Sequence, residues 1–374
     1  MRKTFKYKIY ANEKTIAKTE VWLELCRNLY NCALAERIYA YKMRHKSLSY
    51  ISQQNELPEL RKEFFEYQNI NAQTLQMVLR RLNLAYDGFF RRLKHGEKKG
   101  FPRFKGKHRY DSIEFTQHYW ELNGKYLYIR NIGRFKLKLS RPIQGDIKTI
   151  TIRRTPTNKW YACFSCDNVL VHKLEKCDKQ IGLDVGIKSF CVDSEGVKID
   201  NPKFLKQSLK LLKRKQRKLS RRIKGSIRRR KARLQVAKAY EKVSNQRNDF
   251  LHKLANKYIS EYGIIYIEDL QIQNMVHNKH LARSIADSSW GKFFELLSYK
   301  AEEAGREVIK VKPHNTSQIC SECGEKVGKT LAERIHHCPY CGIILDRDEN
   351  AARNILQVGQ TCQALTKEDT LCVA

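Results

Sequence analysis

The chain has 374 residues, with 73 Lys or Arg against 39 Asp or Glu, so its formal net charge is +34. An excess of this size argues against an ordinary metabolic enzyme and predicts a polyanionic partner, because phosphates offset the self-repulsion of a compact cationic fold. Charge alone leaves a ribosome-associated or otherwise non-specific nucleic-acid binder as the alternative. No apolar run reaches the roughly 18 residues of a membrane span, and the first residues contain no apolar signal core, so we expect neither a membrane protein nor a secreted one.

The first half of the chain predicts a strand, two long helices and then a run of short strands. Residues 4–10 alternate apolar and basic side chains, and apolar residues recur at helical spacing over about 14–45 and 71–93. After the helix-breaking run 100–106, the predicted strands cover 112–116, 126–129, 135–139, 147–153 and 160–165. We interpret these strands as a small antiparallel barrel or sandwich.

Four aromatic residues lie among basic residues at the start of this strand-rich region: Tyr110, Phe115, Tyr119 and Trp120. Aromatic rings in such surroundings can stack on unpaired bases. Packing in the core of the barrel is an equally good interpretation of the same residues.

The second half alternates strands with helices, which indicates an α/β core. A helix is predicted from about 289 to 305, and a frayed tail from about residue 360. Strands are predicted at 181–186, 189–192, 263–269 and 308–311, the first two as a hairpin.

The segment 201–240 contains 17 Lys or Arg residues and no Asp or Glu. Its leucines keep roughly helical spacing and Gly225-Ser226 interrupts it, which predicts a long helix or a pair of helices that continues to about residue 259. A solvated surface helix is the alternative, but such helices usually mix charge signs. We therefore predict that this segment contacts phosphate groups.

Two Cys-x2-Cys pairs, each followed by a glycine, predict a metal site. The pairs are Cys320/Cys323 and Cys338/Cys341, separated by fourteen residues. Four thiolates at this spacing can surround one zinc ion, and the glycines let backbone amides turn toward the sulfurs. Because four thiolates leave no open coordination position, we expect structural zinc. Free or redox-active thiols are the alternative, and they would not need the paired glycines.

Other candidate metal ligands have simpler interpretations. Cys163 and Cys166 are three residues apart on a predicted strand, so they face opposite sides and we interpret them as packing residues. His336 and His337 could replace a thiolate, but the cysteine set is complete without them. We interpret both histidines as loop residues.

Three acids end or interrupt predicted strands or open a helix: Asp184, Glu268 and Asp348. An acid in an apolar strand is costly unless something neutralises it, and paired Mg2+ ions would do so. Two ions about 4 Å apart can activate a water and stabilise the leaving oxygen in phosphodiester hydrolysis. Singly, each acid is better interpreted as a turn residue, a strand terminator or a helix cap. Together, in so cationic a chain, they make a metal-dependent nuclease a competing hypothesis that spacing alone does not decide.

A series of short motifs follows in order along the chain. They read GFPRFK at 100–105, WYA at 160–162, GLDVGIK at 182–188, NQRNDFLHK at 245–253, IEDL at 267–270, ARSI at 282–285, SWG at 289–291, TSQIC at 316–320 and LDRDENAARNI at 345–355. These motifs resemble those of TnpB, the family of RNA-guided DNA endonucleases that insertion sequences encode and that are related to type V CRISPR effectors. The resemblance is dense from about residue 150 to 357 and looser before it.

The resemblance implies a split RuvC-type nuclease, an RNase H-like α/β fold interrupted by a zinc ribbon and preceded by a β-barrel with a helical insertion. The nuclease domain would comprise 179–315 and 343–357, with the zinc ribbon at 316–342 and a tail at 358–374. The N-terminal part would comprise a wedge-like β-barrel at 1–10 and 99–178, with a helical recognition domain at 11–98.

The resemblance also implies that Asp184, Glu268 and Asp348 form a catalytic triad that holds Mg2+, as two ions. Asp348 is preferred to Asp346 because the acid of the family stands two residues before the Asn-Ala-Ala run, while Asp346 could assist. The small Ala351 and Ala352 would let their helix approach the sheet closely.

The implied activity is RNA-guided, Mg2+-dependent cleavage of double-stranded target DNA beside a short flanking motif, in the prokaryotic cytoplasm and in association with the nucleoid. A guide RNA from the transposon end would read the target by base pairing, while the protein reads backbone shape and the flanking motif. A nuclease-inactive, RNA-guided repressor and a strand-transferring transposase are the alternatives. The presence of all three acids argues against the repressor.

Two groups of residues are candidates for nucleic-acid contact. Gln73, Gln76 and Arg80 lie at i, i+3 and i+7 of a predicted helix, where they could read adenine and guanine edges, although ordinary surface residues are slightly favoured. The second group would contact phosphates of RNA or of the heteroduplex, and it consists of Arg217, Arg221, Arg222, Arg229 and Arg230.

Overall fold

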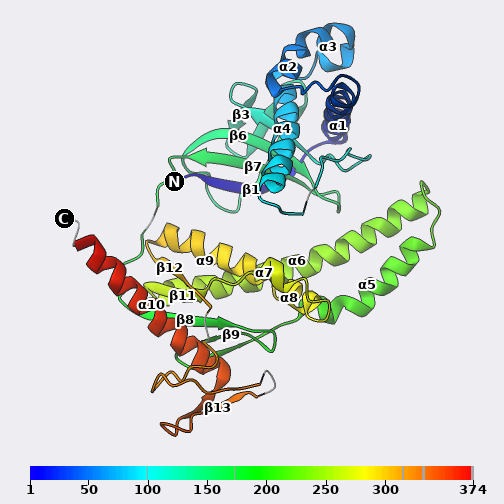
Figure 1. Cartoon of the computed structure of the whole chain (residues 1–374). Coiled ribbons are helices and arrows are strands. Elements are labelled where there is room, and N and C mark those ends of the chain that lie inside the picture. The colour runs from blue at the N-terminus through cyan, green and yellow to red at the C-terminus, as the bar shows by residue number, and fades with distance from the viewer. Residues whose placement is uncertain (99, 172, 314–315, 331–332, 372–374) are drawn as a thin grey trace. The chain divides into compact units, whose positions relative to one another are not determined.

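The computed structural model describes residues 1–98, 100–171, 173–313, 316–330 and 333–371 of the chain. These residues form two compact units, Met1–Leu170 and Val171–Ala374, each with its own sheet and its own core (Figure 1). Among the described residues, no helix is both long enough and apolar enough to cross a membrane.

The first unit is built on one seven-stranded antiparallel sheet in the order β2-β6-β7-β1-β5-β4-β3. The N-terminal strand β1 lies in the middle and pairs with β5 on one side and β7 on the other. The strands are β1 (Lys3–Tyr10), β2 (Ser112–Thr116), β3 (Trp120–Asn123), β4 (Tyr126–Ile129), β5 (Gly133–Lys138), β6 (Asp146–Arg154) and β7 (Trp160–Asp167). All the strands predicted for this half are therefore present, and β3 is an addition that the sequence pattern did not reveal.

Two long helices, α1 (Glu13–Arg44) and α4 (Ala72–Lys94), pack on each other and on this sheet. An asparagine begins each of them, because Asn12 and Asn71 accept hydrogen bonds from amides of the first turn at 2.8 Å. The segment between the two helices forms α2 (Tyr50–Asn55), α3 (Leu57–Glu63) and the 3-10 turn η1 (Phe65–Tyr67).

The aromatic residues at the start of the strand-rich region belong to this core. Tyr110 and Phe115 have exposed fractions of only 4% and 0%, and Tyr119 and Trp120 pack against the same core while partly buried. Burial removes the rings of Tyr110 and Phe115 from the reach of a base. Core packing is therefore the correct interpretation for these two residues.

The second unit has a five-stranded sheet in the order β10-β9-β8-β11-β12, in which β8, β11 and β12 are parallel. Only β9 runs in the opposite direction, because it is antiparallel to both of its neighbours, β8 and β10. A separate two-stranded hairpin follows later in the chain. The strands are β8 (Gln180–Val185), β9 (Ser189–Asp193), β10 (Lys198–Asp200), β11 (Ile264–Glu268), β12 (Glu307–Val311), β13 (Ile335–His337) and β14 (Ile344–Asp346).

Helices cover both faces of the five-stranded sheet, which confirms the predicted α/β core (Figure 1). Ile265 and Ile267 of β11 face α6 (Ile227–Glu261) and α9 (Trp290–Ala304), whereas Tyr266 between them packs with Ile355 of α10 (Arg347–Leu371). Helix α5 (Phe204–Ser220) forms a long hairpin with α6, and α7 (Ile272–Met275) and α8 (Ala282–Ser288) connect β11 to α9.

Two predictions for the C-terminal part are wrong. The chain does not fray from residue 360, because α10 continues to Leu371. Neither His336 nor His337 is a loop residue, because both lie in β13, where His336 is fully buried and His337 is exposed. The sequence pattern also missed β10, β13, β14, α7 and α8, since elements of three to seven residues are too short to show a hydrophobic period.

Helix α10 crosses β8 at very close range. A Cβ atom built on Gly182 would collide with the carbonyl oxygen of Ala352 and would lie 2.8 Å from the backbone nitrogen of Leu356. Ala351 and Ala352 are buried at this crossing, as expected from their small size. Glycine on the strand and alanine on the helix therefore set the distance between α10 and the sheet.

We predict that Gly182→Ala lowers the free energy of unfolding by at least about 2 kcal/mol, because the methyl group meets backbone atoms that cannot rotate away. Chemical denaturation of the full chain measures this change. Gly328→Ala is the matched control, since a Cβ there meets open space and should leave stability unchanged or slightly higher. Equal stability of the two variants would contradict the close crossing.

Candidate active site and cysteine cluster

Asp184 and Glu268 lie side by side at the carboxyl ends of two neighbouring parallel strands. Leu183 of β8 is in register with Ile267 of β11, so the next position on each strand brings the two acids together. Asp348 lies in the first turn of α10, the helix that packs across β8. The structure thus places the three acids singled out in the sequence on three elements that meet at one end of the sheet.

The charges of these acids act on one another. The pKa of Asp184 lies well above its ordinary value, because burial removes water from the carboxylate and because the anions Glu268 and Asp348 repel it. The Arg347 guanidinium and the amide of Val185 oppose the shift without cancelling it. Repulsion of this kind falls with distance, so Glu268 and Asp348 each lie close enough to Asp184 to destabilise its ionised form.

The carboxylates have the chemistry of a site for a hard divalent cation, which prefers oxygen ligands. Among the described residues, only a cysteine cluster has three or more candidate ligand atoms all within 4.8 Å of one another. The three carboxylates therefore do not form so tight a set.

Asp346 has a different environment from Asp348. Burial opposes ionisation of Asp346, but the Lys198 ammonium at 2.5 Å and backbone amides at the start of α10 outweigh it, so the pKa of Asp346 is lowered. Asp346 also accepts a hydrogen bond from the amide of Asp348 at 2.9 Å. Asp346 thus caps the helix and pairs with Lys198, whereas Asp348 is the acid whose charge reaches Asp184.

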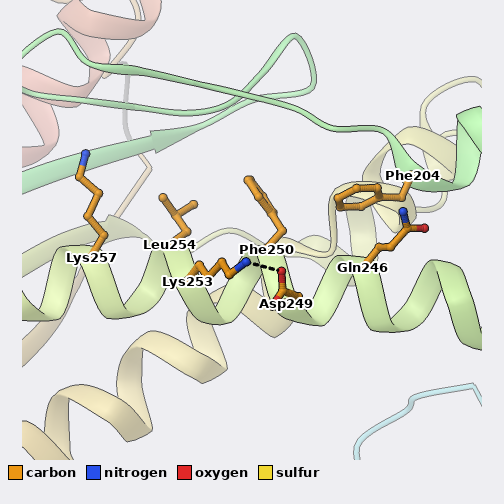
Figure 2. A pocket seen from close by; sticks show the side chains of 7 residues that line it. All are labelled: Phe204, Gln246, Asp249, Phe250, Lys253, Leu254 and Lys257. Carbon is orange, nitrogen blue, oxygen red and sulfur yellow. Dashed lines mark ion pairs between the residues drawn. The ribbon is translucent and has the colours of Figure 1, made fainter.

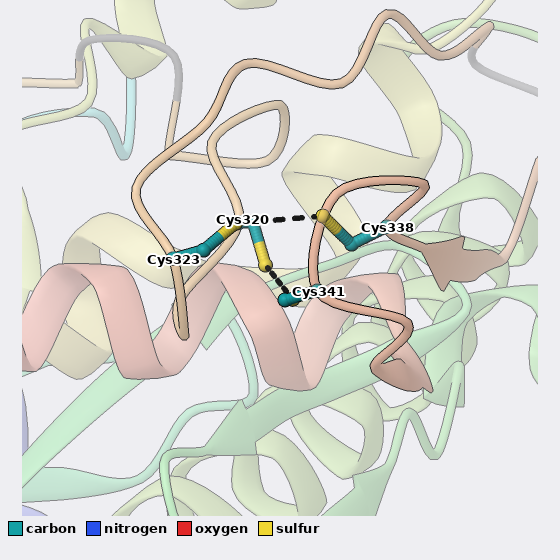
Figure 3. Close-up of side chains that lie close together, drawn as sticks. All are labelled: Cys320, Cys323, Cys338 and Cys341. Carbon is teal, nitrogen blue, oxygen red and sulfur yellow. Dashed lines mark hydrogen bonds between the residues drawn. The ribbon is translucent and has the colours of Figure 1, made fainter.

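The four cysteines converge as their spacing predicts. Their four Sγ atoms all lie within 4.8 Å of one another. The Sγ atoms are 3.7 Å apart in the pair Cys320/Cys341 and 3.5 Å apart in the pair Cys323/Cys338 (Figure 3). The glycines after the two pairs both have left-handed backbone conformations, with φ of +78° and +76°. The cluster is compatible with structural zinc.

The backbone favours the thiolate form that a metal needs at Cys338, whereas at Cys323 and Cys341 burial and neighbouring thiols outweigh the backbone amides and raise the pKa. Burial opposes ionisation of Cys338, but the amides of Cys341 and Tyr340 outweigh it and lower the pKa of Cys338 to about 7. By contrast, Cys163 and Cys166 lie on β7 with one side chain partly exposed and the other buried, as expected for packing residues.

Several residues that support these sites were missed in the sequence. Thr316 donates a hydrogen bond from its hydroxyl to Glu268 at 2.5 Å. Asn350, Asn354 and Gln357 of α10 bond to backbone groups of residues 316–321. The three α10 residues could have been found from their spacing, because positions i, i+4 and i+7 of a helix share one face.

The predicted basic helices are α5 and α6, whose hairpin is coloured green in Figure 1. Arg217, Arg221 and Arg222 line an open hollow along α5 together with four lysine or arginine neighbours. Arg230 is exposed on α6. Arg229 has a different task, since it donates to the carbonyls of Leu219 and Arg222 at 3.0 and 2.6 Å and so closes the turn between the helices.

The base of this hairpin is fixed by one buried acid. Asp287 of α8 accepts from the amides of Leu205 and Lys206 at the start of α5, and it pairs with Arg247 of α6 at 2.8 Å. A small pocket lies beside this base, between Phe204, Phe250 and Leu254, with the ion pair Asp249–Lys253 at its rim (Figure 2). None of the three acids is among the residues that line it.

Gln73, Gln76 and Arg80 lie on α4 of the first unit. Gln73 and Arg80 are exposed and Gln76 is half-buried. The Gln73 side chain accepts a hydrogen bond from the hydroxyl of Thr116 on β2. The structure thus leaves Gln76 and Arg80 without an assigned task.

Three family models match the chain. One described as "Probable transposase" matches residues 161–279, a "Cas12f1-like, TNB domain" matches 290–355, and a "Helix-turn-helix domain" matches 1–46. In this structure the last range holds β1 and the single long helix α1.

A similar protein extends the match to nearly the whole chain. The Streptomyces pristinaespiralis protein named "Putative RNA-guided DNA endonuclease" is 32% identical over 97% of this chain and 91% of its own length. The chain belongs to the TnpB family. The "TnpB-like protein L770" of Acanthamoeba polyphaga mimivirus is 28% identical over 60% of this chain and 46% of its own. The resemblance in the motifs is thereby confirmed.

The fold of this TnpB-family chain is similar to that in a solved structure. In "Cryo-EM structure of the Cas12f1-sgRNA-target DNA complex", the matching chain has a TM-score of 0.59 and 16% identity, over 92% of this chain and 83% of the other. At this level of identity the likeness concerns the fold alone.

We predict that Asp184→Asn raises the unfolding temperature in Mg2+-free buffer. Because the pKa of Asp184 is higher in the folded than in the unfolded chain, its ionisation costs stability. That cost is absent below the ordinary carboxyl pKa and complete above the raised pKa of folded Asp184. The increase in unfolding temperature should therefore be large near pH 8 and small near pH 4.

Thermal scans at the two pH values measure the difference between variant and wild type. Asp200→Asn, at an exposed acid on β10 of the same sheet, is the control and should change neither scan. A gain that is the same at both pH values would show that repulsion at Asp184 is not its source.

Proposed function

We propose that the chain is an RNA-guided, Mg2+-dependent endonuclease that cleaves double-stranded DNA beside a short flanking motif. The observation that carries this proposal is the convergence of Asp184, Glu268 and Asp348, two of which raise the pKa of the third. A relative named as an RNA-guided DNA endonuclease, and a fold shared with Cas12f1 in complex with sgRNA and target DNA, support guide RNA and target DNA as partners.

The three acids would hold the Mg2+ ions through carboxylate oxygens. Bound there, two ions would supply the activation of water and the charge stabilisation that phosphodiester hydrolysis requires. The protein contributes the placement of the acids, because β8, β11 and α10 hold one each. Lys198 neutralises Asp346 and so keeps a fourth anion out of the set.

The proposed nuclease domain is RuvC-like and comprises 179–315 and 343–357, with a zinc ribbon at 316–342. The strand order β10-β9-β8-β11-β12 supports it: counted along the chain it is 3-2-1-4-5 with an antiparallel second strand, as in RNase H-like folds. A structural zinc ion at the four cysteines would fix the ribbon. The wedge at 1–10 and 99–178 and the recognition domain at 11–98 would hold guide RNA and target, with Gln76 and Arg80 as candidate base contacts.

Replacing any one of the three acids by alanine should lower the rate of plasmid cleavage by about 100-fold or more. Loss of a residue that only supports a metal ligand costs about 10- to 100-fold, and loss of the ligand itself should cost at least as much as the upper value. Binding of the guide-RNA complex to its target should be retained, because the acids contribute no attraction to phosphates. The measurement is plasmid cleavage by the chain purified with its co-expressed element-end RNA, with and without Mg2+.

Two further variants sharpen the assignment. Asp200→Ala should cleave as the wild type does, and Asp346→Ala should lose less activity than Asp348→Ala, since Asp346 acts as a helix cap. Undiminished cleavage by Glu268→Ala would refute the proposed triad. Products joined to target DNA, in place of free ends, would indicate a transposase, and target binding without cleavage by the wild type would indicate a repressor.

The hairpin of α5 and α6 would contact phosphates of the guide RNA or of the heteroduplex. Replacing Arg217, Arg221 and Arg222 by Gln should flatten the salt dependence of binding, by about 0.7 to 0.9 in the log–log slope for each phosphate that the variant no longer neutralises. The control removes the same charge from three lysines that lie outside the hairpin and are already paired with acids: Lys62, Lys292 and Lys310. Equal effects of the two triple variants would mean that net charge, not this hairpin, determines binding.

A further inference from the structure

The acid on β11 is held by a residue at the root of the cysteine cluster. The hydroxyl of Thr316 donates to Oε1 of Glu268 at 2.5 Å, and Thr316 itself is only 8% exposed. A hydrogen bond to an ionised carboxylate is stronger than one between neutral groups, and this one is partly shielded from water. It leaves Oε2 of Glu268 unused by Thr316.

Thr316 is in turn held by α10. The side-chain amide of Asn354 donates at 2.7 Å both to the carbonyl of Thr316 and to that of Ile319. Asn350 donates to the same Ile319 carbonyl at 2.7 Å and accepts from the amide of Ser321 at 3.0 Å. Both asparagines are almost fully buried, so these bonds are not in competition with solvent.

These contacts join the two ends of the acid set. Helix α10 carries Asp348 and is fixed against β8, the strand of Asp184, by the crossing at Gly182. The same helix fixes the backbone of Thr316, which orients Glu268. Of the three acids, Glu268 has the longest side chain and the most rotatable bonds, so it has the most freedom to lose.

We propose that Thr316 is a positioning residue for Glu268, through which the root of the cysteine ribbon sets the orientation of this acid for divalent cations. The inference rests on the proposed function, since it assigns Glu268 to metal binding. Loss of a residue that orients a metal ligand typically costs about 10- to 100-fold in metal affinity. Thr316 acts through Glu268, so its loss should raise the Mg2+ concentration needed for cleavage more than it lowers the rate at saturating Mg2+.

The test compares Thr316→Val, which keeps the shape and removes the hydroxyl, with Thr316→Ser, which keeps the hydroxyl. Ser317→Ala, one position along the same segment, is the matched control. Mn2+ binding to the full chain, followed by the EPR signal of free Mn2+, is measured beside the Mg2+ dependence of cleavage. We expect Thr316→Val to raise the Kd for Mn2+ and the Mg2+ concentration that gives half-maximal cleavage by about 10- to 100-fold each. The other two variants should keep both values within about twofold of wild type.

The outcomes separate this proposal from the proposed function. If the wild-type complex does not cleave DNA, the proposed function fails, while Mn2+ binding still decides the role of Thr316. Wild-type affinity in Thr316→Val, or an equal loss in Thr316→Ser, overturns the positioning role. Zinc content is measured on every variant, and if Thr316→Val has lost zinc, Thr316→Ala, which also lacks the hydroxyl, decides by the same criteria.

Discussion

The contact on which the second unit depends is the crossing of α10 over β8. The missing side chain at Gly182 lets the helix backbone lie against the strand, with the carbonyl of Ala352 in the space that a Cβ would need. Two consequences follow from this one distance. Asp348 in the first turn of α10 is brought within electrostatic reach of Asp184, and the asparagines of the same helix are brought to the segment that leads into the cysteine cluster.

The net charge of the whole chain and the local charge at the acid site have opposite signs. The whole molecule carries a charge of +34, whereas the end of the β8–β11 sheet concentrates three carboxylates whose repulsion raises the pKa of Asp184. Neighbouring cations do not remove this repulsion: Lys198 pairs with Asp346, and Arg334 is 3.8 Å from Asp348. The fold therefore stores unfavourable energy in the acid set, which a bound divalent cation would release. Such an expense is typical of sites kept for chemistry rather than for stability.

Sequence reasoning succeeded where a signal is local or long. Both long helices of the first unit, the basic hairpin and the parallel strands have enough residues to show a period, and the cysteine pairs with their glycines define their own geometry. It failed for β10, β13 and β14, which have three residues each, and for His336, whose burial depends on neighbours from elsewhere in the chain. The hydrogen bond from Thr316 to Glu268 spans 48 residues, and no pattern of spacing contains such a contact. The same holds for Asp287, which caps a helix 82 residues earlier in the chain.

The run 345–355 shows why its residues must be assigned by helix face rather than as one motif. Asp346 precedes the helix and caps it, while Asp348 sits in the first turn. Ala352 lies against β8, and Ile355 enters the core with Tyr266. Asn350 and Asn354, four residues apart, share the face that binds the segment 316–321.

A helix with 3.6 residues per turn separates these roles in space although they alternate in sequence, so substitutions at neighbouring positions should disrupt different contacts. A change at Ala352 affects the distance to the sheet, and one at Asn354 affects the support of Glu268, although the two residues are only two positions apart.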